Sequence, residues 1–244
     1  MERVLTGERL VSTPATIEEI GEKLIVGEGR RIILLDGHPD DQLFFGGAVL
    51  DMALSQGEHL PDDFSVTDVT LTLGENGQDF RKPGNPSGES LADARWRENV
   101  AGLQAIFAPL GDEALEVVTG THFPDGSLEE HENDIYDWLN EHHAFRHDAP
   151  AIIVTMNENG GDGHPDHMVA YRVARHLALE RGWPMLVFGL AGSDSAQTHA
   201  LSDIAIERMQ AFAKEQQSQW PDGPPGEHAE LLERNFYQLL LPID

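Results

Sequence analysis

The chain of 244 residues contains no cysteine. Disulfides, iron–sulfur clusters, thiolate zinc sites and cysteine nucleophiles all need a thiol, so the sequence excludes each of them. Any metal must therefore be bound by the side chains of His, Asp or Glu. No apolar run approaches the roughly 18 residues of a membrane helix, and residues 1–13 lack the apolar segment of a signal peptide. We therefore expect a cytoplasmic protein with no membrane span.

Positive charge is scarce. The 16 Lys and Arg residues stand against 43 Asp and Glu residues, which gives a formal net charge of −27 with His neutral. Such a field repels phosphate backbones and anionic lipid surfaces, so we expect no nucleic-acid partner. Lysine occurs only as Lys23, Lys82 and Lys214. This shortage beside abundant carboxylates fits either a high-salt cytoplasm or a GC-rich genome.

What the chain does have is an alternation of short apolar runs with segments of helical spacing. The expected strands cover residues 31–36, 66–73, 114–118, 149–155, 185–188 and 236–241. The expected helices cover residues 43–54, 91–110, 129–143, 165–180 and 204–217. Such alternation is typical of parallel-sheet proteins, so the sequence predicts an α/β, Rossmann-like three-layer fold with a mostly parallel sheet.

Residues 31–244 are expected to form this domain, and residues 1–30 an N-terminal extension. Within the extension, Thr16 followed by Glu19 has the spacing of a capping box and predicts a short helix.

Two short motifs nearly repeat one another. Residues 37–41 (Gly-His-Pro-Asp-Asp) follow the first expected strand, and residues 163–167 (Gly-His-Pro-Asp-His) follow the expected strand at 149–155. Proline favours an extended residue before it and the first position of a helix for itself, so each His and the side chain three residues later should converge. Ligands bind such sheets outside the carboxyl ends of the strands. We therefore expect both motifs to meet in one crevice.

The acidic residues of these motifs can instead serve only to stabilise helix N-termini, with the His residues as ordinary turn residues. Two such turns at equivalent strand ends, in a chain without thiolates, favour a metal site over this alternative. Imidazole and carboxylate ligands suit zinc, and a set of two His and one Asp leaves a coordination position open to water, as in catalytic zinc sites.

Four motifs together resemble those of the LmbE/PIG-L-like zinc-dependent N-acetylglucosaminyl deacetylases. They are a His-Pro-Asp-Asp turn, a Gly-Glu-x-Gly loop, an Arg-x-x-Glu helix and a late His-Pro-Asp-His turn, at residues 37–42, 74–77, 95–98 and 164–167. Weaker matches occur at residues 124–126 and 218–219, so the resemblance extends from about residue 31 to the C-terminus. Gln42 stands where that family usually has Glu, and Gly37 where it has Ala.

The resemblance implies a role for each matching residue. His38, Asp41 and His167 would bind Zn²⁺, and Asp40 would be the general base that takes a proton from water.

Three further residues would serve the reaction or the substrate. His164 would be the electrostatic partner of the oxyanion or the acid for the leaving amine, with Asp166 orienting its ring. Arg95 would bind the substrate together with Asp125. For Arg95 the spacing alone also fits an ordinary surface pair with Glu98.

The implied function is hydrolysis of the N-acetyl group of an N-acetylglucosamine-type conjugate, giving acetate and a free amine. The expected partner is thus a small N-acetylated glycoside, and a homo-oligomer is left open. Two alternatives remain at this point. One is another His/Asp metallohydrolase such as a phosphoesterase, and the other is a sugar-binding homologue that has lost catalysis, for which Gln42 is the support.

Overall fold

The computed structural model describes residues 9–81, 89–119, 123–146, 150–189, 197–224 and 226–243. In this part of the chain eight strands form one sheet, with β7 paired only to β8 and the others in the order β1-β8-β6-β5-β2-β3-β4. Strands β2 to β6 run parallel, whereas β8 is antiparallel to β6, β1 and β7. The strands are β1 (Arg9–Thr13), β2 (Arg31–Asp36), β3 (Val66–Thr70), β4 (Leu115–Thr119), β5 (Ala151–Met156), β6 (Met185–Gly189), β7 (Gln197–Ala200) and β8 (Arg234–Ile243).

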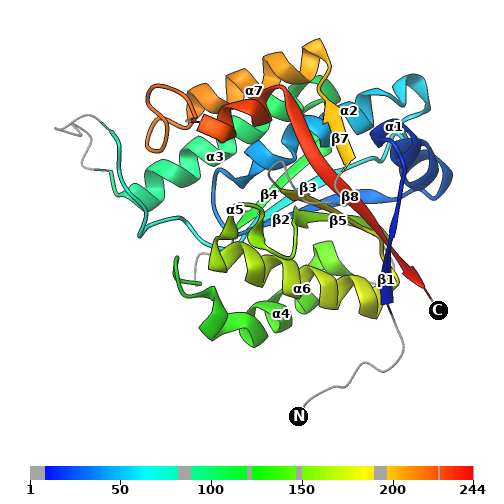
Figure 1. The fold of residues 1–244 in the computed structure, drawn as a ribbon, viewed down its shortest axis with the longest axis horizontal. Helices are drawn as coiled ribbons and strands as arrows, with labels where there is room; N and C mark the ends of the chain where they lie inside the picture. Colours follow the sequence, from blue (N-terminus) through cyan, green and yellow to red (C-terminus); the bar gives the residue numbers. More distant parts are fainter. Residues whose placement is uncertain are drawn as a thin grey trace.

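Helices cover both faces of the sheet (Figure 1). One face carries α1 (Ile17–Ile20), α2 (Gly46–Leu54), α3 (Leu91–Phe107) and α7 (Asp203–Glu215). The other carries α4 (Glu132–Glu141) and α6 (Pro165–Arg181), and the short α5 (Gly160–Gly163) precedes α6. The predicted three-layer α/β fold with a mostly parallel sheet is therefore confirmed.

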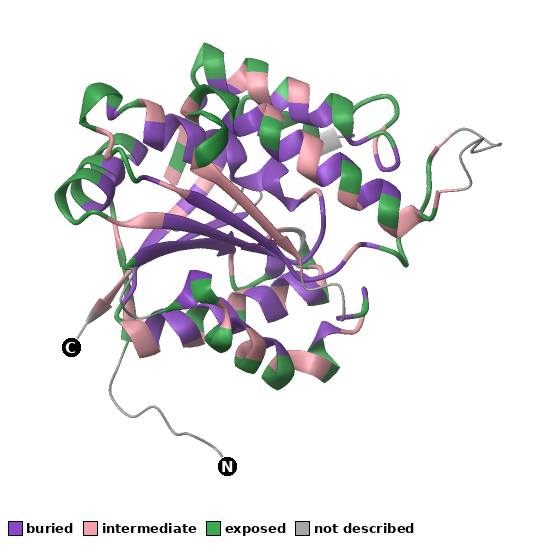
Figure 2. Ribbon diagram, turned by 180° about the vertical axis from the view of Figure 1, so that it is seen from behind, coloured by how far each residue is buried: buried purple, intermediate pink, exposed green. Residues whose placement is uncertain are grey.

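Strand β2 shows why the sheet is buried on both faces. Ile32 and Leu34 belong to the apolar core under α2, α3 and α7, whereas Ile33 and Leu35 belong to the core under α4 and α6. All four side chains are fully buried. A strand buried on both sides reads as a continuous apolar run, which is why this one was predicted with the bounds that the structure has. Figure 2 shows the central strands of the sheet buried between helices whose outer surfaces are exposed.

Two strands were not predicted from the sequence. β1 is mostly exposed and β7 alternates between intermediate and exposed positions, so neither has a buried apolar run. Both are defined by pairing with β8. The predicted capping box is present: the Thr16 hydroxyl accepts the main-chain N–H of Glu19, whose carboxylate accepts that of Thr16. In the described residues no helix is both long and apolar enough to cross a membrane.

The order of the strands determines where the two motifs lie. The chain runs from β2 outward to β3 and β4, and then returns to place β5 on the opposite side of β2. In an open α/β sheet, the ligand crevice lies at such a reversal, outside the carboxyl ends of the two strands. β2 leads directly into the first motif, and β5 leads through α5 into the second.

On the far side of α2, Asp51 connects this helix to the start of α7. Its carboxylate accepts hydrogen bonds from the Ser202 hydroxyl and main-chain N–H (2.8 Å for the latter) and from Nε2 of His199 at 2.9 Å. Ser202 is the N-cap of α7. Burial would raise the pKa of Asp51, but these hydrogen bonds outweigh it and lower the pKa.

We expect Asp51→Ala to lower the free energy of unfolding at pH 7 by about 1–3 kcal/mol, because the capping serine and the imidazole lose a charged acceptor. Because the pKa of Asp51 is lowered by folding, the stabilisation from its ionised carboxylate is complete above the unfolded pKa of about 3.9. This stabilisation is lost as the pH falls through the pKa of Asp51 in the folded protein. Urea unfolding at pH 7 and at pH 3.5 measures both effects. Asp62→Ala, at an exposed loop position, is the control, and an equal loss in both variants would contradict the assignment.

Candidate active site

The first motif forms a tight turn closed by its own aspartate. One carboxylate oxygen of Asp41 accepts the main-chain N–H groups of Gly37 and His38, each at 2.9 Å. The other oxygen lies 3.0 Å from Nε2 of His167 in the second motif. Burial would raise the pKa of Asp41, but the neighbouring imidazoles of His167 and His38 outweigh it and lower the pKa to about 2. Asp41 therefore stays ionised.

The second motif opens α6 in the predicted way. Pro165 occupies the first helical turn, and His164 is the N-cap, whose Nδ1 accepts the main-chain N–H of Asp166 at 3.2 Å. His167 lies one turn further along. Its Nδ1 is 2.8 Å from the carbonyl oxygen of Gly160, which can only accept, so Nδ1 carries the hydrogen. In the neutral ring, Nε2 of His167 therefore presents a lone pair.

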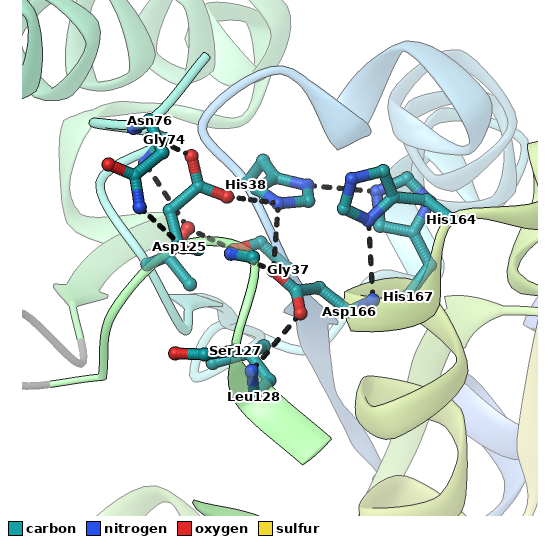
Figure 3. Close-up of polar contacts among 12 residues, drawn as sticks. Gly37, His38, Gly74, Asn76, Asp125, Ser127, Leu128, His164, Asp166 and His167 are labelled. Carbon is teal, nitrogen blue, oxygen red and sulfur yellow. Dashed lines mark hydrogen bonds and ion pairs between the residues drawn. The ribbon is translucent and has the colours of Figure 1, made fainter. Parts of the chain in front are cut away.

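His38 is held in a complementary way. Its Nε2 faces two carboxylates, at 3.0 Å from Asp125 and 3.3 Å from Asp166, so this nitrogen carries the hydrogen. Its Nδ1 lies 2.9 Å from Nε2 of His167 and 3.9 Å from Asp41 (Figure 3). Two imidazoles from different strand ends thus present their ligand nitrogens to one point beside a carboxylate.

These separations fit a metal. Ligand atoms at about 2.0–2.2 Å from a tetrahedral zinc lie about 3.3–3.6 Å apart. Nε2 of His167 lies near this distance from Nδ1 of His38 (2.9 Å) and from one oxygen of Asp41 (3.0 Å), and the other Asp41 oxygen is 3.9 Å from Nδ1 of His38. His164 lies near the same point, since one nitrogen of each of His38, His164 and His167 is within 4.8 Å of the others. A carboxylate or carbonyl on the second nitrogen of each ligand imidazole is the usual support in zinc sites.

The electrostatics of the site also favour a cation. Burial disfavours a charged imidazole, but Asp125, Asp166 and Asp41 outweigh it and raise the pKa of His38 to about 10. The carboxylates thus favour a positive charge at the His38 ring, which a bound divalent ion would supply in place of the proton. Asp40 behaves differently: burial, and then the charge of Asp41, raise its pKa to about 6. A carboxylate with this pKa can take up a proton near neutral pH.

Asp166 and Asp125 both contact the His38 ring. The Asp166 carboxylate also accepts the main-chain N–H groups of Gly126 (2.7 Å) and Leu128 (3.1 Å). The group that Asp166 offers to His164 is its main-chain N–H. Asp125 accepts the main-chain N–H of Asn76 at 2.9 Å and so connects His38 to the Gly-Glu-x-Gly loop (Figure 3).

Arg95 is buried against that loop. A Cβ atom at Gly74 or Gly77 would lie 2.4 or 2.5 Å from its guanidinium nitrogens, so only glycine allows this approach. One nitrogen of the guanidinium donates to the carbonyl of Gln78 at 3.3 Å, and Nε is buried without a hydrogen-bond partner among the described residues. Glu98 is buried as well and accepts from Ser218. The alternative of an exposed Arg95–Glu98 pair is therefore wrong.

Gln42 lies beneath the site and bridges two buried carboxyl groups. Its Nε2 donates to Asp36 and to Asp68, each at 2.9 Å. Burial, followed by the charge of Asp68, raises the pKa of Asp36 well above its usual value, and burial raises that of Asp68 to about 6. A neutral donor at position 42 thus suits a site where two acids already face each other.

The catalytic candidates share a cavity of about 190 Å³ with residues that the sequence analysis did not assign to the site. His38, Asp40, Asp41, Arg95, Asp125, His164 and His167 all line it. The unassigned lining residues are Leu43, Phe44, Gly77, Gln219, Trp220 and His228. The last three follow α7, far along the chain from both motifs. No spacing distinguishes His228 from the other eleven histidines, so only the folded chain reveals it.

The comparisons with known proteins can now be set beside this geometry. The PIG-L family, described as GlcNAc-PI de-N-acetylase, matches residues 33–178, which is more than half of the chain. The chain belongs to this family. The resemblance found in the sequence motifs is therefore confirmed.

Two curated relatives are named 1D-myo-inositol 2-acetamido-2-deoxy-alpha-D-glucopyranoside deacetylases. The one from Thermobifida fusca is 31% identical over 207 residues, covering 75% of this chain and 67% of the relative. The one from Catenulispora acidiphila is 30% identical over 169 residues, covering 61% of this chain and 48% of the relative. The chain thus spans about half to two thirds of the length of these PIG-L family relatives.

Two solved structures share the fold. The zinc-inhibited form of teicoplanin deacetylase Orf2 aligns with a TM-score of 0.58 and 14% identity, over 88% of this chain and 99% of that one. The A40926 pseudoaglycone deacetylase Dbv21 aligns with a TM-score of 0.52 and 15% identity, over 88% and 97% of the two chains. At 14–15% sequence identity, this structural similarity shows that the chain shares the fold of these two deacetylases and shows no more than that.

We expect Gln42→Glu to destabilise the protein, although it restores the usual acid of the family, because it buries a third carboxyl group between Asp36 and Asp68. The loss should be about 2–5 kcal/mol at pH 8 and smaller at pH 5. A buried acid with a raised pKa is tolerated while protonated and costs stability as the pH rises above its unfolded value. Denaturant unfolding at the two pH values checks this, with Gln104→Glu on an exposed position of α3 as the control. An unchanged stability at pH 8 would contradict it.

Proposed function

We propose that this chain is a zinc-dependent N-deacetylase that hydrolyses the acetamide of an N-acetylglucosamine-type conjugate to acetate and a free amine. The observation that carries the proposal is the pair of imidazoles, His38 and His167: each ring is oriented by a hydrogen bond at one nitrogen, and the other nitrogen faces one point beside Asp41. Family membership and the names of the curated relatives support the same chemistry.

His38, Asp41 and His167 would hold the zinc ion. When bound, zinc lowers the pKa of water and polarises a carbonyl group. Asp40 lines the same cavity, and its pKa of about 6 lets it accept the proton of the attacking water at neutral pH.

His164 would act on the oxygen or the leaving nitrogen of the acetamide. Burial, followed by the charges of His38 and His167, lowers its pKa, so the ring is neutral near pH 7. Because Nδ1 accepts the Asp166 N–H, the proton of the neutral ring is on Nε2. This N–H can donate to a developing oxyanion or to the amine.

The carboxylates around His38 would fix its orientation. We assign this role to Asp166, in place of the orientation of His164 expected from the resemblance, since its carboxylate lies 3.3 Å from His38 and is anchored by two main-chain N–H groups. Asp125 would share the role and remain within reach of a sugar hydroxyl. Arg95, which lines the cavity from α3 beside the glycine loop, would bind the substrate.

A single metal is favoured over the two-metal site of a phosphoesterase. Two clusters of side chains among the described residues could each hold a metal, one of His38 with His164 and His167 and one of His38 with Asp125 and Asp166, and both share His38 with the proposed set of His38, Asp41 and His167. Two ions about 3.5–4 Å apart would each need a separate set of ligands, and two groups that share one imidazole do not provide two separate sets.

Variants of the proposed zinc ligands and of the proposed general base should separate the loss of zinc from the loss of turnover. His38→Ala, Asp41→Ala and His167→Ala should each lower the zinc content, because each removes one of three ligands. Asp40→Asn should keep zinc and lower kcat about 10²- to 10⁴-fold, the usual scale for a general base. Elemental analysis of the purified variants and acetate release from N-acetylglucosaminides measure the two effects. Loss of zinc from Asp40→Asn, with retention in Asp41→Ala, would reverse the roles of the two carboxylates.

A further inference from the structure

The loop of residues 157–161 leads from β5 into α5 and carries the carbonyl oxygen that orients His167. That oxygen belongs to Gly160 and lies 2.8 Å from Nδ1 of His167. The other end of the same peptide group is the main-chain N–H of Gly161, which donates to Oδ1 of Asn157 at 3.0 Å. A trans peptide group is planar, so its C=O and N–H point in opposite directions. By holding the N–H end, the Asn157 side chain directs the carbonyl end toward His167.

This peptide group lies between two glycines with unusual backbone angles. Gly160 has a φ of 72°, and Gly161 has a φ of 71° with a ψ of −67°. The angles of Gly161 are those of the rarer and more strained kind of γ-turn. Glycine permits such angles, but it also lets the peptide group rotate to other orientations at little steric cost. An orientation that the backbone does not itself favour needs a partner that holds it.

The carboxamide of Asn157 has the contacts of such a partner. Its Oδ1 also accepts the N–H of Asn159 at 3.0 Å, and its main-chain carbonyl accepts the N–H of Gly160 at 2.8 Å. The main-chain N–H of Asn157 donates to the carbonyl of Phe188 in β6 at 2.7 Å, which ties the start of the loop to the sheet. At Gly189, the next residue of β6, a Cβ atom would lie 2.2 Å from Nδ2 of Asn157. A side chain at that position would therefore displace the carboxamide.

The loop borders open space as well as packed side chains. Asn157, Glu158 and Asn159 line a second cavity, of about 390 Å³, and none of its described lining residues also lines the catalytic cavity. Atoms that face a cavity have no packing partners on that side. The hydrogen bonds of Asn157 therefore carry more of the task of holding the loop.

We propose that Asn157 is a positioning residue for the metal site, whose carboxamide holds the peptide group between Gly160 and Gly161 so that Nε2 of His167 faces the zinc position. The inference rests on the proposed function, because it takes His167 as a zinc ligand. A hydrogen bond accepted from the N–H end also polarises the peptide group and makes its carbonyl a stronger acceptor. Removing a group that supports a ligand imidazole in this way lowers metal affinity.

Zinc affinity, measured by competition with a chelator, tests this role without turnover. Asn157→Ala should weaken zinc binding about 10- to 100-fold, the usual effect of removing such a supporting group. Asn157→Asp keeps an acceptor oxygen at the same position and should retain most of the affinity. Asn159→Ala is the matched control, because it removes an exposed carboxamide from the same loop and keeps the main-chain N–H that Asn157 accepts. It should leave zinc affinity unchanged.

A variant outside the loop tests the same contact in a chain that keeps Asn157. Gly189→Ala should displace the carboxamide and weaken zinc binding, and it decides the matter even if Asn157→Ala folds poorly. In the Asn157→Ala background, Gly189→Ala should have little further effect, because the group that it displaces is already absent. An unchanged zinc affinity in Gly189→Ala, or losses that simply add in the double variant, would contradict the inference.

The zinc-free protein gives an independent readout. The Nδ1 hydrogen of His167 should give a slowly exchanging NMR signal in the wild type and in Asn157→Asp, and a rapidly exchanging one in Asn157→Ala. If Asn157→Ala is less stable but keeps its zinc affinity and this signal, Asn157 is only structural and the inference is overturned, as it is by an equal loss of zinc affinity in Asn159→Ala. If the wild type binds zinc but releases no acetate from N-acetylglucosaminides, the proposed function fails, and a weaker zinc affinity of Asn157→Ala would still support the inference.

Discussion

The structure depends on one constraint, which is that two imidazoles from distant parts of the chain meet with their ligand nitrogens directed at each other. A carbonyl oxygen fixes His167 and two carboxylates fix His38, so neither ring can turn away without losing a hydrogen bond. The sheet makes the meeting possible, because β2 and β5 are neighbours at the point where the strand order reverses. A parallel sheet brings the carboxyl ends of such strands to one edge. The cavity, Asp40 and the supporting loops are arranged around that point.

The excess of acidic residues has a local counterpart in the site. Asp41, Asp125 and Asp166 surround His38 and hold a positive charge there, while Asp40 is tuned by burial toward neutrality. Below them, Gln42 donates a hydrogen bond to both Asp36 and Asp68, whose carboxyl groups also contact each other. The departure from the usual glutamate of the family thus has a structural reason in this chain, since a third acid would add to the repulsion.

Most of the sheet could be predicted from the sequence, because buried parallel strands are continuous apolar runs and the two His-Pro-Asp motifs each specify a local turn. β1 and β7 could not, since their exposed sequences lack such a run and pairing with β8 defines them. Within the site, too, contacts between residues far apart in the chain could not be predicted from local sequence. That His164 caps α6 is local information, but the carboxylate partners of His38 come from residues 125 and 166. Trp220 and His228 reach the cavity from the segment after α7, which no local spacing indicates.

The central claim is that one zinc ion binds where the ligand atoms of His38, His167 and Asp41 converge. X-ray absorption at the zinc edge, on protein loaded with one equivalent of metal, tests it most directly. The account predicts a single zinc with nitrogen and oxygen ligands at about 2.0–2.2 Å and the outer-shell scattering of two imidazoles. A second metal at about 3.5–4 Å would indicate two-metal chemistry instead, and a spectrum without imidazole scattering would contradict the account.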